Sequence, residues 1–344
     1  MIVKTYLTLL LLLANALTPV FGQSPAGIAL DEGAGRHARL VAAAKQEGSL
    51  LLYTTIAATS MEKIAADFER KYGVKVNSWR AGTNKVLQRV LTETKGNRFD
   101  VDAIHFGSPE MEILHQEKLL REIKSVHFKD LIPNALPAHK EWAATYVNLF
   151  VQAYNTNKVK KDELPKAYRD LLDPKWKGRL GIESQDQEWF YAVVTDMGEE
   201  KGLKFFRDLV ARNGLSVRTG HSVLTNLVVS GEVPLALTVH HYLPEQLKHK
   251  GAPIDWFAIE PAIGRANAIA VTKKAPHPHA AILFYEYMIS DGQKLLAEMD
   301  YVPTNKKIPS PVKNLPIKLL DPSILVGEND KWTKLYEDTI RGIK

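Results

Sequence analysis

Residues 48–79 read GSLLLYTTIAATSMEKIAADFERKYGVKVNSW. The apolar run at 49–53 predicts a buried strand, and the alternation of apolar and polar residues at 74–79 predicts a second strand. Between them, apolar side chains recur at the spacing of one helix face: Met61, Ile64, Ala65, Phe68 and Tyr72. Gly73 follows the last turn, where helices prefer glycine. A strand, a helix and a strand in this order predict a parallel sheet covered by helices.

The same alternation of strands and helices continues outward along the chain. Further strands are predicted at 99–106, 146–154, 180–182, 217–219, 233–239, 254–260 and 268–272. Further helices are predicted at 83–96, from 108 onward, and at 188–197, 202–211, 222–230 and 278–290. The predicted class is therefore α/β, with two doubly wound lobes joined by crossing strands near 146–154 and 254–272.

These elements divide the chain into four expected parts. Residues 1–22 are expected to be a signal peptide. Residues 45–140 together with 262–310 are expected to form lobe 1, and residues 145–258 lobe 2. The remaining segment, 311–344, is expected to be a C-terminal tail that packs on the surface. A chain of 344 residues with 45% hydrophobic composition is long enough for two cores.

The amino-terminal segment and the cysteine count predict an exported protein. The apolar run at 6–16 is shorter than the roughly 20 residues that a membrane-spanning helix needs. This length, with Thr18 and Pro19 at its end, favours a cleaved signal peptide over an uncleaved membrane anchor. The chain has no cysteine, which excludes disulfides and a lipid-modified amino terminus. We therefore expect a free periplasmic protein that is not a lipoprotein.

The charge pattern excludes some partners and leaves others open. The formal net charge is +6, and the basic residues are spread along the chain without a dense run of lysine and arginine. No basic stretch is interleaved with aromatic residues, so we expect no binding to nucleic acid. An anionic small ligand is compatible with this mild positive charge.

The candidate ligand-binding residues follow from the predicted strand ends, because open α/β sheets bind ligands beyond the carboxyl ends of their strands. The candidates are Thr54, Thr55, His105, Ser108, Ser184, Ser222, His240, His241, Tyr242 and Arg265. The hydroxyl residues stand near predicted helix starts, where backbone N–H groups attract anions, although plain N-capping accounts for them equally well. Arg265 is a candidate clamp for a carboxylate or a phosphate.

Several stretches resemble the extracellular solute-binding proteins of the ferric-iron-binding type. They are LLLYTTIA at 50–57, DFERKYGVKV at 67–76, FDVDAIHFGSPEME at 99–112, SGEVPLALTVHHYLPEQLKHKGAP at 230–253, APHPHAAILFYEYMISDGQKLL at 275–296 and YVPTN at 301–305. This resemblance implies a bilobal fold of the second periplasmic-binding-protein type. It also implies the role of substrate-binding component of an ABC importer, with a permease in the inner membrane as partner.

The resemblance implies metal ligands but is incomplete at the ligand positions. Ferric members of the family place adjacent tyrosines after a strand of the VPLAL type, and this chain has His240, His241 and Tyr242 there. Tyr242 and His241 are therefore the implied metal ligands. Because neighbours on an extended segment point to opposite sides, His240 and Tyr242 should share a face. The loop at 54–57 lacks the histidine of other members, and Ser108 stands where a carboxylate is frequent.

The cargo and the wider role stay open at this point. The cargo is either ferric iron, bare or chelated, or a small organic anion such as a phosphonate, sugar phosphate or carboxylate. We expect no required cofactor, Fe(III) entering only as transported ligand, and a monomeric protein. A sensor kinase is an alternative partner to the permease. An enzyme is disfavoured, because the chain has no H-E-x-x-H, G-x-S-x-G, Walker or G-x-G-x-x-G motif.

Overall fold

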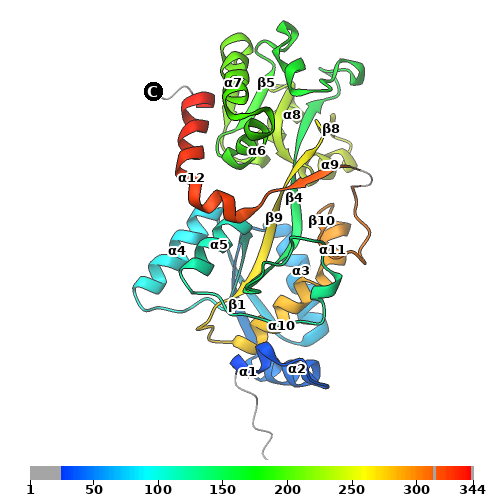
Figure 1. The fold of residues 1–344 in the computed structure, drawn as a ribbon. Coiled ribbons are helices and arrows are strands. Elements are labelled where there is room, and N and C mark those ends of the chain that lie inside the picture. Colours follow the sequence, from blue (N-terminus) through cyan, green and yellow to red (C-terminus); the bar gives the residue numbers. More distant parts are fainter. Residues whose placement is uncertain (1–24, 313–314, 342–344) are drawn as a thin grey trace, which may run out of the picture.

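The computed structural model describes residues 25–312 and 315–341, so the expected signal peptide at 1–22 lies outside the described residues. Two bodies lie one above the other, and a single sheet continues through both (Figure 1). The strands are β1 Ser49–Thr54, β2 Lys75–Arg80, β3 Ala103–Gly107, β4 Trp142–Asn155, β5 Leu180–Glu183, β6 Ser216–Arg218, β7 Leu235–His240, β8 Ile254–Phe257, β9 Ala262–Val271, β10 Val302–Pro303 and β11 Ile317–Leu319. The central strand order is β2-β1-β3-β9-β4-β7-β5-β6. We call the body around β1, β2 and β3 lobe 1, and the body around β5, β6 and β7 lobe 2.

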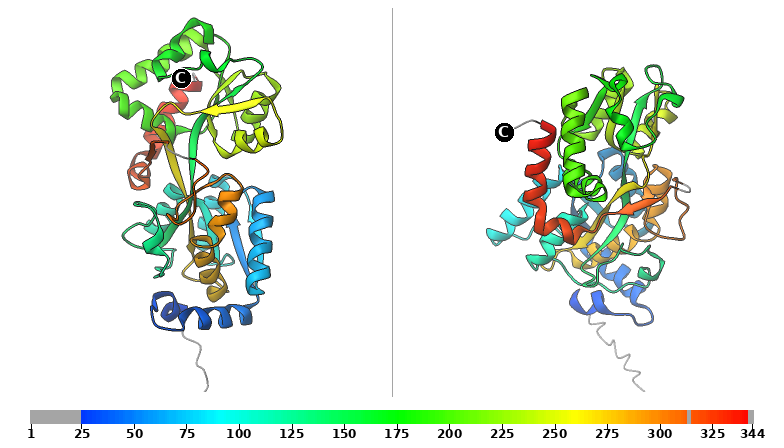
Figure 2. Two further views of the ribbon diagram at one scale, coloured as in Figure 1. Left: turned by 90° about the vertical axis from the view of Figure 1, so that its right-hand side faces the viewer. Right: turned by 45° about the horizontal axis from the view of Figure 1, so that its top comes forward.

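Helices cover both faces of the sheet in the two lobes (Figure 2). The α-helices are α1 Pro25–Leu30, α2 Arg36–Glu47, α3 Ala58–Tyr72, α4 Thr83–Lys95, α5 Ser108–Gln116, α6 Gln187–Met197, α7 Glu199–Asn213, α8 His221–Ser230, α9 Tyr242–His249, α10 Pro278–Met288, α11 Gly292–Glu298 and α12 Pro322–Tyr336. Short 3-10 turns lie at Phe128–Asp130, Lys161–Glu163, Tyr168–Leu172 and Pro174–Trp176, and a π-helical turn at Glu337–Arg341 follows α12. The predicted α/β class and the bilobal architecture are confirmed.

The stretch at residues 48–79 folds as its pattern predicts. β1 and β2 pair in parallel, with Ser49 opposite Lys75, and α3 connects them. The apolar face of α3 is buried in lobe 1. Gly73 ends the helix with a positive φ of 69°, and its N–H donates to the carbonyl oxygen of Glu69. Glycine adopts this left-handed conformation without a steric penalty, so the chain turns directly into β2.

Two long strands join the lobes. All residues of β4 are buried, because β4 pairs with β9 along most of its length and with β7 and β8 in lobe 2. β9 continues into lobe 1, where it pairs with β3. Strands were predicted at 254–260 and 268–272, and the structure has two strands there, β8 and β9, but β8 ends earlier and β9 begins earlier than predicted. β9 runs unbroken from Ala262, because residues 262–264 pair with β11 and residues 263–264 also pair with β4.

Each lobe has its own hydrophobic core. In lobe 1, Phe68 packs edge-on against Phe284, with ring centroids 5.0 Å apart. In lobe 2, Phe190 and Phe206 lie 4.8 Å apart beside the buried Trp189. Over the described part of the chain, no helix combines the length and the apolar composition that crossing a bilayer requires.

The C-terminal segment is built into the fold. β11 pairs in parallel with β9, and α12 then packs on α5 of lobe 1 and on α6 of lobe 2 (Figure 1). Trp332 and Tyr336 of α12, and Ile340 beyond it, are buried in the core of lobe 2. The segment expected to pack on the surface therefore supplies core side chains. The expected lobe boundaries stay a prediction.

Gly202 allows α6 and α7 to approach closely. A Cβ built on this residue would lie 2.6 Å from the Cα and the carbonyl oxygen of Val194. Because these are backbone atoms, the helices would have to separate. We expect Gly202→Ala to lower the free energy of unfolding by about 1–3 kcal/mol in urea titrations. Gly327→Ala, in open space on α12, is the matched control and should cause no loss. Equal effects of the two substitutions would contradict the prediction.

Candidate functional site

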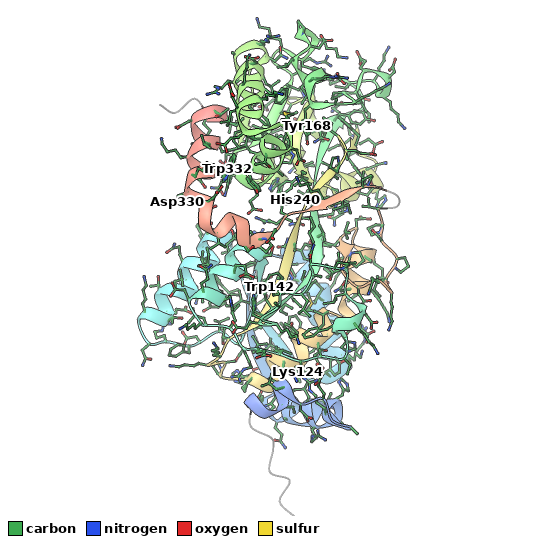
Figure 3. All side chains as sticks on the ribbon, viewed as in Figure 1. Lys124, Trp142, Tyr168, His240, Asp330 and Trp332 are labelled. Atoms are coloured by element: carbon green, nitrogen blue, oxygen red, sulfur yellow. The ribbon has the colours of Figure 1, made fainter. Side chains whose placement is uncertain are left out.

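Strands from both lobes end at one place between the lobes. In lobe 1, β3 ends at Gly107 and α5 begins with the next residue. In lobe 2, β5, β6 and β7 are each followed within a few residues by α6, α8 and α9. His240, the last residue of β7, lies at this level (Figure 3). We define the interlobe site by the side chains that these ends bring together: Glu110, Glu183, Asp186, Glu188, His221, His240, Tyr242 and Arg265.

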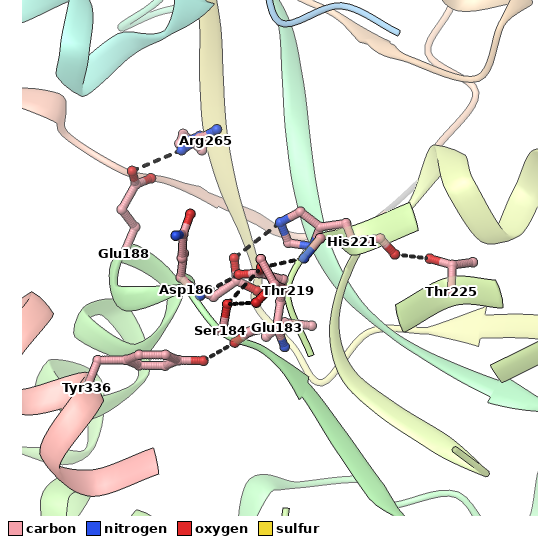
Figure 4. A network of polar contacts seen from close by, with 12 residues as sticks. Glu183, Ser184, Asp186, Glu188, Thr219, His221, Thr225, Arg265 and Tyr336 are labelled. Carbon is pink, nitrogen blue, oxygen red and sulfur yellow. Dashed lines mark hydrogen bonds and ion pairs between the residues drawn. The ribbon is translucent and has the colours of Figure 1, made fainter. Parts of the chain in front are cut away.

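Arg265 of β9 has acidic neighbours in both lobes. Its Nη1 donates to Oε1 of Glu188, in the first turn of α6, at 3.0 Å (Figure 4). Glu110, in the first turn of α5, is the second neighbour. A Cβ built on Gly107 would lie 2.5 Å from Oε2 of Glu110 and 3.3 Å from Cζ of Arg265. Burial raises the pKa of Glu110 to about 7, while Arg265 lowers it and Glu188 raises it further. Arg265 with Glu188 and Glu110 therefore forms one charged cluster that links the two lobes electrostatically.

Two imidazoles and a carboxylate lie together on the lobe 2 side. Nε2 of His221 and Oδ1 of Asp186 are 3.2 Å apart (Figure 4). The rings of His221 and His240 have centroids 3.8 Å apart with an angle of 35° between their planes. Burial lowers the pKa of His240, and the neighbouring His221, Arg265 and His241 lower it further. Burial also opposes protonation of His221, but Asp186 and Glu183 outweigh it and raise its pKa.

Glu183 holds the backbone of the site. Its Oε1 accepts a hydrogen bond from the backbone N–H of Gly220 at 2.8 Å, and its Oε2 accepts one from the N–H of Gln185. Its own carbonyl oxygen accepts a hydrogen bond from the hydroxyl of Tyr336, which ties α12 to the end of β5 (Figure 4). Glu183 therefore fixes the two loops that carry Asp186 and His221.

Tyr242 connects the site to lobe 1 through a second tyrosine. The half-buried ring of Tyr242 lies 6.0 Å from that of His240 and 4.4 Å from that of Tyr301. The hydroxyl of Tyr301 donates to Oγ of Ser60 in α3 at 3.3 Å. Burial raises the pKa of Tyr242 far above its ordinary value, and the adjacent Tyr301 raises it further. The phenol is therefore protonated at neutral pH, and a metal ion would have to displace this proton.

Buried polar atoms without a hydrogen-bond partner gather in this site. Among the described residues, those of the interlobe site are Glu110 Oε2, Asp186 Oδ2, Glu188 Oε2, His221 Nδ1, His240 Nδ1 and Arg265 Nε. Buried polar groups are normally paired, because an unpaired one costs about 1–3 kcal/mol. Such a concentration of unsatisfied atoms, drawn from both lobes and from β9, indicates a ligand-binding site.

The structure brings three of the predicted residues together in the interlobe site: His240, Tyr242 and Arg265. Ser184 is next to it, and its hydroxyl is 3.0 Å from that of Thr219. The rings of His240 and Tyr242 lie side by side, as predicted, but not through strand alternation, because β7 ends at His240 and Tyr242 begins α9. His241, between β7 and α9, packs its ring edge-on against Trp256 at 5.9 Å. Burial lowers the pKa of His241 to about 4.

The other predicted residues lie outside this cluster or at its edge. Oγ1 of Thr54 accepts a hydrogen bond from the backbone N–H of Ile56 at 3.1 Å. Thr55 is half-buried in the following loop, and Ser108 is buried at the start of α5. Ser222 is exposed beside His221. His105 is fully buried with Nε2 2.7 Å from Oγ1 of Thr145, and burial lowers its pKa to about 3.

Sequence reasoning did not select Asp186, Glu188 or His221. Asp186 and Glu188 follow the predicted strand at 180–182 by four and six residues, and His221 follows the predicted strand at 217–219 by two. Candidates taken from each predicted strand end through the first turn of the following helix would have included them. Their approach to Arg265 depends on the path of β9, which no short sequence window contains.

A second group of ligand-type side chains lies in lobe 1: Glu112, His115 and His139. Its members bind one another and their neighbours. Nε2 of His139 is 3.1 Å from Oε1 of Glu112, while its Nδ1 accepts the backbone N–H of Glu141. Nδ1 of His115 is 2.8 Å from Oε2 of Glu141. Because both nitrogens of His139 are engaged, this group forms a hydrogen-bonded network and is less suited to hold an ion than the interlobe site.

Comparisons with known proteins agree with this architecture. Residues 104–328 match the family model described as "Bacterial extracellular solute-binding protein". The chain is 25% identical over 289 residues to "Iron uptake protein A1" of Synechocystis sp., covering 77% of this chain and 80% of the relative. It is also 25% identical over 320 residues to the "Major ferric iron-binding protein" of Neisseria meningitidis, covering 87% of this chain and 95% of the relative.

Solved structures share the fold. Iron-bound HitA from Pseudomonas aeruginosa superposes with a TM-score of 0.74 at 26% identity, covering 85% of this chain and 99% of that protein. The periplasmic binding protein AfuA from Actinobacillus pleuropneumoniae, solved with fructose-6-phosphate, gives a TM-score of 0.73 at 21% identity, covering 86% and 99%. The second likeness concerns the fold alone.

Proposed function

Because the chain belongs to the family of bacterial extracellular solute-binding proteins, we propose that it is the periplasmic substrate-binding component of an ABC importer and captures ferric iron or a ferric chelate between its lobes. The relatives named for ferric iron and iron uptake support this cargo. Export through the segment at 1–22, a monomeric state and delivery to an inner-membrane permease are parts of the same proposal, and no catalytic step is needed.

The observation that carries the proposal is the buried excess of acid in the interlobe site. The site contains four carboxylates, Glu110, Glu183, Asp186 and Glu188, and one guanidinium, Arg265. Oε2 of Glu110, Oδ2 of Asp186 and Oε2 of Glu188 are buried without a hydrogen-bond partner, and a bound cation would stabilise these oxygens. Carboxylates and a phenol are hard oxygen donors, which suit a ferric ion. Tyr242 offers the phenol at the edge of the same site.

A second observation favours a chelate or an organic anion as the form of the cargo. Nε of Arg265 is buried and has no partner. A guanidinium N–H of this kind binds a carboxylate or phosphate well. A ferric chelate with carboxylate groups satisfies both the acidic residues and Arg265. A sugar phosphate, phosphonate or carboxylate without iron satisfies Arg265 and the helix starts, and is the alternative cargo.

A visible-absorbance titration with ferric citrate tests the proposal. We expect a tyrosinate-to-iron band on binding, because displacement of the Tyr242 proton by iron creates that chromophore. Tyr242→Phe should abolish the band. Tyr154→Phe is the control, since Tyr154 lies in β4 beside Phe257, and it should leave the band unchanged. A colourless titration of the unmodified protein would reject iron capture through Tyr242. Thermal stabilisation by iron-free sugar phosphates or phosphonates would then establish the alternative.

A further inference from the structure

We propose that lobe 1 carries a second ligand-binding site, separate from the interlobe site, that accepts a single aromatic ring bearing a carboxylate. The site is a cavity of about 130 Å³ between the C-terminal half of α4, the segment that leads into β3, and the segments that follow α5 and β9. Neither the capture of iron nor the importer role requires it, so this inference goes beyond the proposed function. We call it the lobe 1 pocket and define it by Val90, Phe99, Val101, Leu119, Lys118 and Lys274.

The lobe 1 pocket lies at the end of the sheet away from the interlobe site. Val101 precedes Gly107, where β3 ends at the interlobe site, by six residues, and extended chain covers about 20 Å over that length. Thr272 follows the last residue of β9, and its Oγ1 donates to the carbonyl oxygen of Val101 at 2.8 Å. This hydrogen bond fixes two of the segments that frame the pocket to each other. A ligand bound here therefore stays clear of the interlobe site.

The walls of the lobe 1 pocket are apolar and have the size of one ring. Val90 and Val101 are buried, while Phe99 and Leu119 are half-buried. An engineered apolar cavity of about 150 Å³ in another protein binds benzene, so a cavity of this volume admits a single aromatic ring. The half-buried ring of Phe99 offers an aromatic neighbour in the wall, and offset or edge-on contacts between rings are favourable. These features favour an aromatic group as the apolar part of the ligand.

Most charged groups that line the lobe 1 pocket already have a partner. The carboxylate of Glu93 accepts hydrogen bonds from the hydroxyl of Tyr53 at 3.0 Å and from Nε of Arg89 at 2.8 Å. Its negative charge is therefore offset within the protein. Arg98 is paired with Asp100, and Nζ of Lys273 lies 3.8 Å from Oε1 of Glu141.

Lys118 and Lys274 supply the positive charge that is left over at the rim of the lobe 1 pocket. Both side chains are exposed, and no carboxylate among residues 25–312 and 315–341 forms an ion pair with either of them. Nζ of Lys274 lies 3.9 Å from the ring centroid of Phe99, so a cation stands directly over the aromatic wall. Ligand sites commonly combine apolar walls with a few charged groups that fix orientation. A ligand with its ring against Phe99 and its carboxylate between the two lysines satisfies both features.

The probe that tests this site is 4-fluorobenzoate, titrated into the purified protein and followed by fluorine NMR. We expect saturable binding of one equivalent, and weaker binding of 4-fluorobenzamide, which has nearly the same shape but no charge. The double variant Lys118→Gln/Lys274→Gln should weaken 4-fluorobenzoate binding by about tenfold, the effect of two exposed charge interactions, and leave 4-fluorobenzamide binding unchanged. Thr94→Trp, which places a large ring at the half-buried Thr94 of the pocket wall, should abolish binding of both compounds.

A matched control and a second location make the outcome decisive. Lys63→Gln/Lys85→Gln removes two exposed charges elsewhere on lobe 1 and should leave binding unchanged. Circular dichroism and thermal unfolding establish that each variant is folded, and the lysine variants decide alone if Thr94→Trp does not fold. The inference is overturned if 4-fluorobenzoate shows no saturable binding, if the two compounds bind equally, or if binding survives the Lys118→Gln/Lys274→Gln change at full strength. Loss of binding in Arg265→Met alone would place the ligand in the interlobe site and would also overturn it.

Discussion

Trp332→Ala should lower the free energy of unfolding by about 3–5 kcal/mol, the usual cost of removing a fully buried tryptophan. The indole of Trp332 packs edge-on against Tyr191 at 5.0 Å and lies 6.3 Å from Phe190 on α6. Its Nε1 donates to Glu328 at 2.8 Å. Truncation would leave a cavity between α12 and lobe 2. Urea denaturation followed by circular dichroism, a signal that does not rely on tryptophan fluorescence, measures the change in the free energy of unfolding.

Asp330→Ala provides the control for this prediction, because Asp330 is exposed on the same helix (Figure 3). It should change the free energy of unfolding by less than about 0.5 kcal/mol. A loss below about 1 kcal/mol for Trp332→Ala would mean that α12 adds little to the core of lobe 2. In that case the hydrogen bond between Tyr336 and Glu183 would be its main link to the site.

Arg265→Met should cost about 3–5 kcal/mol at pH 8, because it leaves Glu188 and Glu110 buried without their shared cation. Because Arg265 lowers the pKa of Glu110, the variant should hold the Glu110 proton to a higher pH than the unmodified protein, and the cost should shrink as the pH falls. The pKa of Glu110 is raised to about 7, so the folded protein binds a proton between pH 4.5 and 7 that the unfolded chain does not bind. Stability contributed by this group therefore decreases as the pH rises through 7. Thermal unfolding between pH 5.5 and 8 measures the trend.

Two further variants separate this effect from the loss of any arginine. Arg218→Met breaks an exposed ion pair with Glu232, whose atoms are 3.2 Å apart, and should cost less than about 1 kcal/mol. Adding Glu110→Gln and Glu188→Gln to Arg265→Met should restore most of the stability and flatten its pH dependence. If Arg265→Met is as stable at pH 8 as the unmodified protein, Arg265 does not offset these carboxylates.

Local sequence patterns predicted most of the fold because the decisive signals are short. The strand at 49–53, the helix face from Met61 to Tyr72 and Gly73 all act within one supersecondary unit. The patterns failed where pairing is not local. The start of β9 reads as a turn around residues 261–264, yet it is held as a strand by β4 and β11. α12 went unrecognised, because its burial depends on contacts with helices that precede it by more than a hundred residues.

The site was predicted only in part, again because several of its contacts join segments that are distant in the sequence. The strand-end rule pointed to the correct edge of the sheet, whereas the predicted neighbourhood of His240 and Tyr242 arises from the turn into α9 and not from alternation along a strand. The meeting of His221 with Asp186, and of Glu188 with Arg265, depends on strand order and on a crossing strand. Strand order and the path of the crossing strand are not encoded in a contiguous motif, so these contacts could be identified only from the structure.

The pairing of β3 with β9 has a consequence for the order in which the chain folds. Lobe 1 cannot complete its sheet until β9 is available, and β9 follows the whole of lobe 2 in the sequence. Contacts between such distant segments slow folding, since a long loop must close before they form. For a chain proposed to leave the cytoplasm, this delay is useful. The amino-terminal half stays open for translocation until the later strands have been synthesised.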